Sequence, residues 1–428
     1  MKIKINNAWV LENGEVTQKT VCIDKKIVSV TKADDVPVDF EPDTVIDGSN
    51  KLLMPGMVNS HTHAYMSVFR NLADDLAFEE WLFGRISPLE DKLTLNDCYW
   101  GNMLSCLEMI KSGTTCFVDM HLALNQSVLA AQDAGMRAVI SRGLVGSDRN
   151  EAGAVKRISE AFSEWEYAQE NGFSRLKFML APHAIYTCGK DYLQYIAEVA
   201  KEKGWGINIH LSETKHEVEE SLKNNGMSPV KYIDSLGLLD VPVIAAHCVN
   251  LDDDDIAILK AKNVSVATNP ASNMKLGNGF APVNRLINEG INVCLGTDSQ
   301  ASNNTLNMFT EMRLLSLIHK GVDLDAQAMP AKTVLKCATE NGYRAIGMGD
   351  IAGKIEAGKL ADIVLLDIDA PQFYPRNNLV SALVYSANGS EVDTVIIDGE
   401  IVMKNKEVLT IDTERVYHEI NRITQNYM

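Results

Sequence analysis

The sequence is short of positive charge, of paired cysteines and of long apolar runs. Its 428 residues include 40 Lys and Arg against 57 Asp and Glu, which gives a formal net charge of −17. Nucleic acids and anionic membranes are bound through clustered cations that neutralise phosphate groups. The charge balance therefore argues against both partners and indicates a solvated acidic surface.

Eight cysteines occur, but none of them forms a CxxC pair, so reduced thiols are favoured over a disulfide scaffold. No stretch approaches the roughly 18 consecutive apolar residues of a membrane span. The opening segment MKIKINNAWVLENGE lacks the apolar centre of a signal peptide. Together these absences predict a cytoplasmic location.

Two kinds of pattern are present. The ends of the chain are β-like, with KIKINNAWVL, EVTQKTVCID and KIVSV near the N-terminus and LADIVLLDID, VDTVIIDG and EIVMKN near the C-terminus. In the long middle, short apolar runs alternate with helical stretches, as in βα units on a parallel sheet. Eight runs are candidate strands: 52–61, 114–120, 137–143, 176–182, 206–213, 243–249, 264–270 and 292–299. They predict an α/β fold with a (β/α)8, TIM-like barrel.

Polar side chains that are capable of chemistry gather at the ends of these runs, not at their starts. They are His61, His63, Arg142, His183, His210, His247, Asn269 and Asp298. Barrel enzymes assemble their sites at the carboxyl ends of several strands. The pattern therefore predicts an active site at that rim.

His61 and His63 form an HxH pair whose side chains share one face of an extended strand, so both imidazoles can reach one ion. Taken alone, the pair also fits ordinary polar residues at a strand end. His210 and Asp298, at the ends of the fifth and eighth runs, make a metal site the better interpretation. Three neutral imidazoles and a carboxylate suit Zn²⁺, which lowers the pKa of a bound water towards about 7.

Three residues are candidates for moving protons. Asp298 could take a proton from the attacking water, His247 could stabilise negative charge, and Glu213 could protonate a substrate ring nitrogen. Taken singly, His247 and Glu213 fit a structural role about as well. The fourth run ends without a lysine that could bridge two metals, since Lys177 stands at its start. We therefore expect a single metal ion.

Several segments together resemble a known family. PGMVNSHTHAYMSVFRNLADDLAFEEWL, HLSE, AAHCV, NPASNMKLGNGFAP and GTDSQASNN are similar to motifs of the amidohydrolase superfamily, and within it to the 5-methylthioadenosine/S-adenosylhomocysteine deaminases. The resemblance covers nearly the whole chain and implies a barrel that interrupts a small β-sandwich built from both chain ends. The implied boundaries are 1–54 for the first part of the sandwich, 55–355 for the metal-dependent barrel and 356–428 for the second part with a C-terminal helix.

The resemblance also implies roles for individual residues. Matched position by position, the zinc ligands are His61, His63, His210 and Asp298, and the proton-handling residues are Glu213, His247 and Asp298. Glu213 and Asp298 would also contact the substrate. The implied cofactor is one zinc ion per subunit, with iron as the other candidate, and relatives are commonly homo-oligomers.

A further set would bind the nucleoside. Glu90 matches a carboxylate that binds ribose hydroxyls, although a surface charge in a helix is the simpler interpretation of the sequence alone. Arg142 matches an arginine that meets the carboxylate of a homocysteine tail. His183 matches a residue near the sugar or base. Trp81 fits an apolar wall and a core position equally well.

Two departures from the family pattern concern the substrate. The family often carries a second arginine after the position of Arg142, but neither Arg149 nor Arg157 aligns there without a gap. Ser299 and Gln300 follow Asp298 where relatives more often have smaller residues, and Gln300 could alter the pocket near the base. The preference among adenine nucleosides is therefore left open.

The implied activity is zinc-dependent hydrolytic deamination of an adenine nucleoside to its hypoxanthine product and ammonia. The candidate substrates are 5′-methylthioadenosine, S-adenosylhomocysteine, 5′-deoxyadenosine and adenosine. One alternative is a deaminase or hydrolase of another aminated heterocycle, such as guanine or a triazine. The other is a non-catalytic barrel that serves as a binding module. The PCxxC motif of the unrelated cytidine-deaminase fold is absent.

Overall fold

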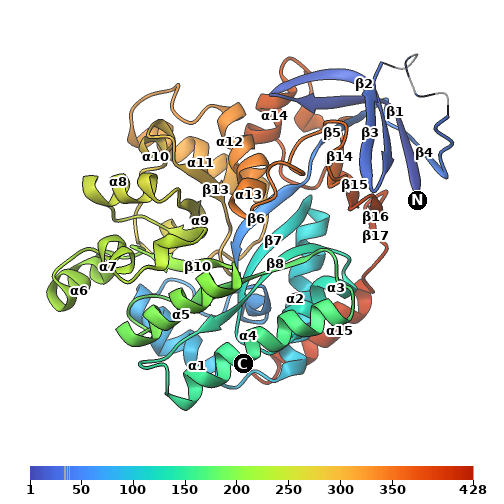
Figure 1. Cartoon of the computed structure of the whole chain (residues 1–428). Helices are drawn as coiled ribbons and strands as arrows, with labels where there is room; N and C mark the ends of the chain where they lie inside the picture. The colour runs from blue at the N-terminus through green and yellow to red at the C-terminus, as the bar shows by residue number, and fades with distance from the viewer. Residues whose placement is uncertain (33–34, 36, 38, 428) are drawn as a thin grey trace.

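The computed structural model describes residues 1–32, 35, 37 and 39–427. Its central element is a barrel of eight strands, each parallel to its neighbour and arranged in chain order (Figure 1). The strands are Met57–Thr62 (β6), Thr114–His121 (β7), Arg137–Leu144 (β8), Leu176–Pro182 (β9), Gly206–Leu211 (β10), Val243–His247 (β11), Ser265–Thr268 (β12) and Asn292–Leu295 (β13). Most of their side chains are buried because helices cover the outside and side chains fill the inside.

The barrel closes where its last strand meets its first. Asn59 accepts a hydrogen bond from the Thr297 backbone N–H at 3.0 Å and donates its amide to the Thr297 hydroxyl at 2.7 Å. The backbone N–H of Asp298 donates to the carbonyl of His61 at 3.0 Å. These bonds bring the ends of β6 and β13 together, and the predicted barrel is confirmed.

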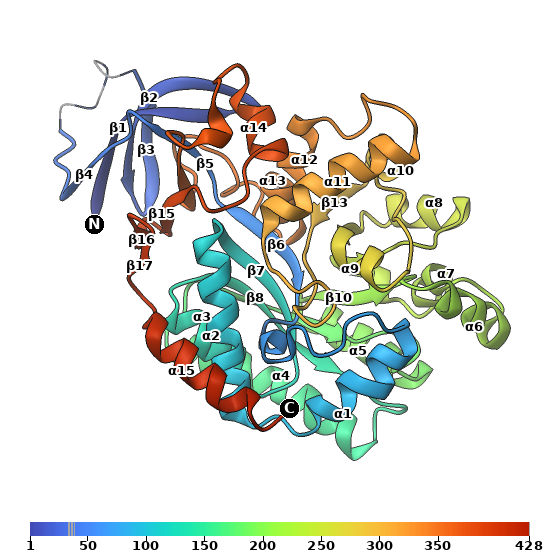
Figure 2. The same ribbon diagram turned by 180° about the vertical axis from the view of Figure 1, so that it is seen from behind.

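Helices and short helical turns connect and surround the strands (Figures 1 and 2). They are Ala64–Phe69 (η2), Glu80–Ile86 (η3, a π-helix), Ser87–Glu90 (α1), Leu95–Lys111 (α2), Gln126–Asp133 (α3), Ala152–Glu170 (α4), Lys190–Lys203 (α5), Lys215–Asn225 (α6), Pro229–Ser235 (α7), Leu238–Asp240 (η4), Asp253–Ala261 (α8), Pro270–Lys275 (α9), Val283–Asn288 (α10), Met308–Val322 (α11), Ala331–Ala338 (α12) and Glu340–Ala345 (α13). The apolar stripe of α5, for example, buries Tyr192, Leu193 and Ile196 against the barrel, as an amphipathic helix does.

Both chain ends contribute to a second, mixed sheet. Its strands are Lys2–Glu12 (β1), Glu15–Asp24 (β2), Lys26–Thr31 (β3), Thr44–Asp47 (β4), Lys51–Pro55 (β5), Ile363–Asp367 (β14), Val392–Ile397 (β15), Glu400–Lys404 (β16) and Glu407–Val408 (β17). The two ends meet where β5 pairs antiparallel with β14. Ile27 of β3 and Ile396 of β15 share one apolar cluster although several strands separate them, so the sheet curls around its own core. The β-rich unit expected from both termini is confirmed.

One predicted strand is wrong. The run 52–61 is two strands, because β5 pairs within the end sheet whereas β6 pairs with β7 in the barrel. Gly56 separates them, and a Cβ at this position would lie 2.1 Å from the Thr115 hydroxyl oxygen. The chain changes sheet at a close approach that only glycine permits. The pair Pro55-Gly56 within the run is the one sign of this change in the sequence. The proposed domain boundaries stay predictions.

The remaining elements follow β14. They are Pro371–Phe373 (η5), Leu379–Tyr385 (α14) and Thr413–Thr424 (α15). The C-terminal α15 leaves the end sheet and lies along α2 on the outside of the barrel in both views (Figures 1 and 2). The Tyr427 hydroxyl donates to Asp97 at 2.7 Å, and Arg415 stacks over the Trp100 ring with 5.0 Å to its centroid.

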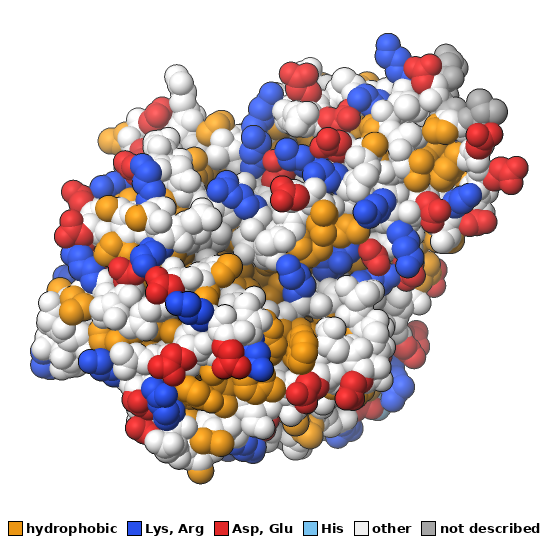
Figure 3. Space-filling view, viewed as in Figure 1, with side chains coloured by type: hydrophobic (Ala, Val, Ile, Leu, Met, Phe, Trp, Pro, Cys, Tyr) orange, Lys and Arg blue, Asp and Glu red, His pale blue; other side chains and the backbone are white. Residues whose placement is uncertain are grey.

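The charged surface and the free cysteines agree with the expectations from the composition. Acidic and basic side chains are interspersed over the face shown in Figure 3. All eight cysteines are free and buried. Within the described residues, no helix is long and apolar enough to cross a membrane.

Candidate metal centre and active site

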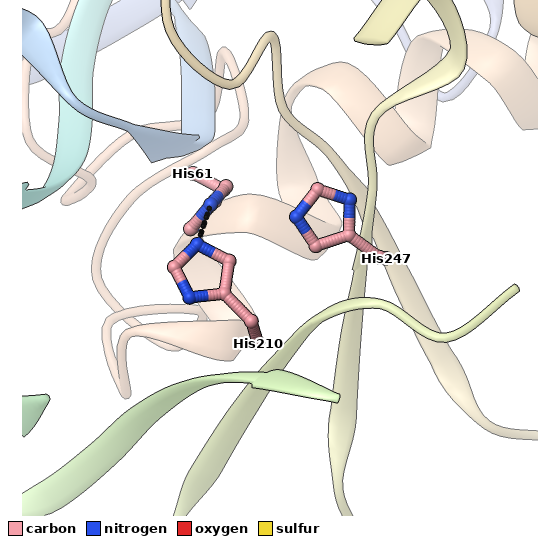
Figure 4. Close-up of side chains that lie close together, drawn as sticks. All are labelled: His61, His210 and His247. Atoms are coloured by element: carbon pink, nitrogen blue, oxygen red, sulfur yellow. Dashed lines mark hydrogen bonds between the residues drawn. The ribbon is translucent and has the colours of Figure 1, made fainter. Parts of the chain in front are cut away.

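The four predicted metal ligands converge at the carboxyl end of the barrel. The Nε2 atom of His210 lies 3.1 Å from Nε2 of His61 and 3.1 Å from Nε2 of His63. Asp298 directs Oδ1 to the same point, 3.7 Å from His61 Nε2 and 3.5 Å from His63 Nε2. In Figure 4 the rings of His61 and His210 meet at their nitrogen atoms, while His247 stands beside them. All four side chains are buried.

Backbone carbonyls decide which ring nitrogens point at this centre. The Nδ1–H of His63 donates to the carbonyl of Met120 at 2.9 Å, and the Nδ1–H of His210 donates to the carbonyl of His183 at 2.7 Å. In the neutral tautomer that these bonds select, Nε2 carries only a lone pair. Burial, together with neighbouring imidazoles, holds the pKa of His210 well below its ordinary value, so its ring is neutral.

Two bare lone pairs 3.1 Å apart repel each other unless a cation lies between them. Ligands about 2.0–2.1 Å from Zn²⁺ at near-tetrahedral angles lie about 3.3 Å apart, which is close to the observed separations. The ligand atoms of His61, His63 and Asp298 lie within 4.8 Å of one another. Nε2 of His210 adds a third imidazole nitrogen, 3.1 Å from those of His61 and His63, so this buried set fits a divalent metal ion.

The carboxylate of Asp298 is held by two hydroxyl groups. Ser272 and Ser302 donate to its Oδ2 at 2.6 and 2.7 Å, which leaves Oδ1 free to face the imidazoles. Asp298 has a backbone φ of 63°, in the left-handed region that non-glycine residues rarely adopt. His247, at the end of β11, also has a positive φ, of 73°. Strain of this kind collects at functional sites, where the surroundings fix it.

His247 and Glu213 lie beside the metal centre. The Nδ1–H of His247 donates to Asn273 at 2.8 Å, and its Nε2 has no partner among the described residues. That Nε2 lies 3.8 Å from the Glu213 carboxylate, which accepts a hydrogen bond from Asn278 at 3.0 Å. Burial, with a smaller effect of Asp298, raises the pKa of Glu213 well above its ordinary value. The raised pKa favours the protonated form of Glu213, which a proton donor requires.

A cavity of about 320 Å³ opens over these groups. Besides His63, His210, Glu213, His247 and Asp298, it is lined by residues that include Trp81, Glu90 and His183. The Tyr65 hydroxyl donates to Glu90 at 2.6 Å, and the Trp81 indole N–H donates to the carbonyl of Ala301 at 3.2 Å. Burial and the neighbouring His63 lower the pKa of His183 to about 3, so this ring is neutral.

The arginines are arranged differently from the expected pattern. Arg142 donates through Nε and Nη2 to Glu160 at 3.0 and 2.8 Å, and through Nη1 to two backbone carbonyls, and it does not line the cavity. Arg157, one turn before Glu160 on α4, does line the cavity. Arg149 lies at the surface in an ion pair with Asp191.

The residues after Asp298 face away from the cavity. Gln300 donates to the Ser105 hydroxyl of α2 at 2.8 Å, and the Ser299 hydroxyl lies 3.2 Å from that of Ser302. Both side chains are fully buried, and neither lines the cavity over the metal centre.

The comparisons with known proteins agree with this geometry. A model of the amidohydrolase family matches residues 52–402. The chain belongs to the amidohydrolase family. It is 46% identical over 400 residues to a 5-methylthioadenosine/S-adenosylhomocysteine deaminase of Thermoanaerobacter pseudethanolicus, covering 93% of this chain and 92% of the relative.

Two further amidohydrolase comparisons cover most of the chain. A deaminase of the same name from Acetivibrio thermocellus is 48% identical over 397 residues, which is 92% of this chain and 91% of that protein. A zinc-bound crystal structure of an adenosine deaminase from Xanthomonas campestris superposes with a TM-score of 0.94 at 30% identity, covering 99% of this chain and 98% of that one.

Sequence reasoning did not find the residues that hold these groups in place. Asp119 of β7 accepts hydrogen bonds from the Thr62 hydroxyl at 3.0 Å and from the Ala64 backbone at 2.8 Å, and so fixes both sides of His63. Ser272 and Asn273 act in the same way on Asp298 and His247. Ser272 and Asn273 lie in the segment NPASN, just after the end of the seventh run. This position near a strand end is the only sign of their role in the sequence.

Proposed function

We propose that this chain is a zinc-dependent hydrolase that removes the 6-amino group from the adenine ring of a nucleoside, giving the hypoxanthine nucleoside and ammonia. One observation carries the proposal. A buried centre of three histidine nitrogens and Asp298 Oδ1 shares its cavity with the Glu213 carboxyl, whose pKa is well above its ordinary value. The names of relatives at 46 and 48% identity support the choice of substrate.

Each residue has a task in the water addition. Zinc, held by His61, His63, His210 and Asp298, would supply Lewis-acid chemistry that makes water nucleophilic at neutral pH. Asp298 takes a proton from the attacking water on a remaining lone pair of Oδ1, the oxygen that faces the imidazoles, because two serines occupy Oδ2. As oxygen adds to C6, Glu213 protonates the neighbouring N1. His247 Nε2, which carries a lone pair while Nδ1–H donates to Asn273, assists deprotonation of the water and, once it holds a proton, stabilises the charge that develops on the oxygen.

The second half of the reaction breaks the C6–N bond. The proton that Asp298 took from the water passes to the amino group, which leaves as ammonia. The hydroxyl proton on C6 returns to Glu213 as the C6 carbonyl forms, and N1 keeps the proton it received. The cavity holds the base over the reacting groups, so the reaction does not have to bring separate molecules together in the transition state. Neutral His183 and the Trp81 ring line the walls against which the nucleoside lies.

The sugar and its 5′ substituent would occupy the other end of the cavity. Glu90, oriented by Tyr65, is placed to accept hydrogen bonds from ribose hydroxyls. Arg157 is the arginine available to an anionic tail, because Glu160 and two carbonyls already satisfy most of the Arg142 donors. We infer that any carboxylate of a homocysteine tail pairs with Arg157 first.

An absorbance assay tests the proposal, because conversion of adenine to hypoxanthine changes the ultraviolet spectrum. The panel is 5′-methylthioadenosine, S-adenosylhomocysteine, 5′-deoxyadenosine, adenosine and guanine. We expect turnover of at least one adenine nucleoside, release of one ammonia per turnover and no turnover of guanine. Turnover of guanine alone would contradict the proposal. A cytoplasmic location, zinc rather than iron, and assembly as a homo-oligomer are further parts of this proposal.

A further inference from the structure

Glu217 lies close behind the proposed proton donor without reaching the reaction cavity. It stands on α6, four residues after Glu213, and its side chain is buried. Its Oε2 accepts the backbone N–H of Glu213 at 2.7 Å, and its Oε1 accepts that of Ser212 at 3.2 Å. Glu217 borders an adjoining cavity of about 630 Å³ and does not line the one over the metal centre. The two cavities share Phe78, Phe83 and Tyr186.

The backbone that Glu217 holds makes an unfavourable turn. Ser212 has a φ of 50°, in the left-handed region, and is fully buried. The turn lets His210 face the metal centre while Glu213, only three residues later, faces the substrate cavity. Backbone strain of this kind persists only where the surroundings fix it. One carboxylate that accepts two consecutive N–H groups supplies such a restraint.

An ordinary helix-capping role does not explain this contact. The Thr214 hydroxyl already caps α6 by accepting the Glu217 backbone N–H at 3.0 Å. In a capping box the carboxylate three residues later would return to the Thr214 backbone N–H. Here it reaches beyond Thr214 to the two preceding residues.

The loop after β11 restrains the same turn from the other side. Val249 and Asn250 donate their backbone N–H groups to the Ser212 carbonyl at 3.0 and 2.9 Å, and the Asn250 side chain donates to the Glu213 carbonyl at 3.0 Å. These bonds hold the carbonyl groups, whereas Glu217 holds the N–H groups. Together the two sets restrain the backbone from which the Glu213 side chain leaves.

We propose that Glu217 is a positioning residue for Glu213, which it holds in line with the ring nitrogen through the backbone of the Ser212–Glu213 turn. The inference rests on the proton-donor role proposed for Glu213. A carboxylate is required because it offers an acceptor to each N–H group. Glutamine has one carbonyl oxygen and would present an NH2 group to the other N–H.

A double-mutant cycle tests this inference on the metal-loaded full chain, with Glu217→Gln, Glu213→Gln and the double variant. We expect Glu217→Gln to lower kcat by about 10- to 100-fold with little change in KM or zinc content, as a misplacement of about 1 Å does. In the Glu213→Gln background the same change should cause no further loss, because the residue that Glu217 positions is already disabled. Glu220→Gln, one turn along the same helix, is the control and should match the parent enzyme.

The following results distinguish failure of the positioning role of Glu217 from failure of the proposed function. Losses that multiply in the double variant, or a lowered melting temperature with unchanged kcat, would overturn the positioning role and leave the deaminase proposal intact. If the parent enzyme deaminates no nucleoside of the panel, the proposed function and this inference both fall. If Glu217→Gln does not fold, Glu217→Asp keeps the charge on a shorter side chain, and the same non-additivity with Glu213→Gln is expected.

Discussion

The two ends of the cavity over the metal centre differ in how firmly contacts fix their side chains. At the metal end, His63, His210 and Asp298 each have a second contact that fixes the orientation of the group facing the centre. At the far end, Arg157 has a single hydrogen bond, to the carbonyl of Val145, while Arg142 is turned to Glu160. The groups proposed for the chemistry are thus each held by a second contact, whereas the proposed recognition of the 5′ substituent would depend on Arg157. Mutations at the two ends should therefore differ in kind as well as in size.

Removal of a metal ligand should have the largest effect. In His210→Ala the centre loses the ring that lies 3.1 Å from both other imidazoles, so we expect bound zinc and turnover to disappear together. Metal analysis of the purified protein alongside the ammonia assay measures both. His216→Ala, an exposed histidine on α6, is the matched control and should keep both. Full activity in the His210 variant would remove the basis for the metal centre.

Loss of the proton donor should be severe but should spare the metal. For Glu213→Gln we expect kcat to fall by about 10²- to 10⁴-fold, the usual contribution of general acid–base catalysis. Zinc content should stay at that of the parent enzyme, since Glu213 is outside the four ligands. A variant that retained most of its kcat would show that N1 is protonated by another group.

At the far end the effect should depend on the substrate. Arg157→Ala should lower kcat/KM for S-adenosylhomocysteine by about 10- to 100-fold, because a hydrogen bond to a charged group contributes about 1.5–3 kcal/mol. Turnover of uncharged 5′-methylthioadenosine should hardly change. Arg142→Ala should affect both nucleosides alike, since it breaks the contact with Glu160. If Arg142→Ala impaired turnover of S-adenosylhomocysteine selectively and Arg157→Ala did not, the tail carboxylate would pair with Arg142.

The smallest expected effect is on pH-dependent stability. Glu311 of α11 is fully buried and accepts hydrogen bonds from the Ala271 backbone at 3.1 Å and from Asn303 at 2.8 Å. Burial raises its pKa to about 8, so between about pH 4.5 and 8 the folded chain holds a proton that the unfolded chain has released. Its contribution to stability therefore declines as the pH rises through this window.

Glu311→Gln removes this titration. The melting temperature of the parent enzyme relative to the variant should fall by a few degrees between pH 5 and pH 8. Thermal unfolding of both proteins across that range measures the difference. A constant difference, or one that grows with pH, would show that Glu311 is ionised in the folded protein throughout.

The sequence allowed the barrel and the metal end to be predicted because both follow from the ends of strands. His61, His63, His210 and Asp298 each close an apolar run, and the barrel brings those ends to one rim whatever lies between them. The far end could not be predicted in the same way. Whether Arg142 or Arg157 faces the cavity depends on how α4 packs and on Glu160, and spacing along the chain does not show this.

Two other features could not be predicted from the sequence, because they too depend on how the chain packs. The strand change at Gly56 depends on the approach of Thr115 from another strand. Glu217 follows Thr214 with the spacing of a capping box, so the sequence favours a local cap. The observed contacts with Ser212 and Glu213 depend on the turn that β10 makes into α6.

The proposed function depends on one metal ion that side chains far apart in the sequence hold jointly. A crystal structure of the zinc-loaded protein, with anomalous scattering measured at the zinc edge, tests it most directly. We predict one peak about 2.0–2.2 Å from Nε2 of His61, His63 and His210 and from Oδ1 of Asp298. A peak elsewhere, or a zinc ion that leaves any of these four atoms uncoordinated, would contradict it.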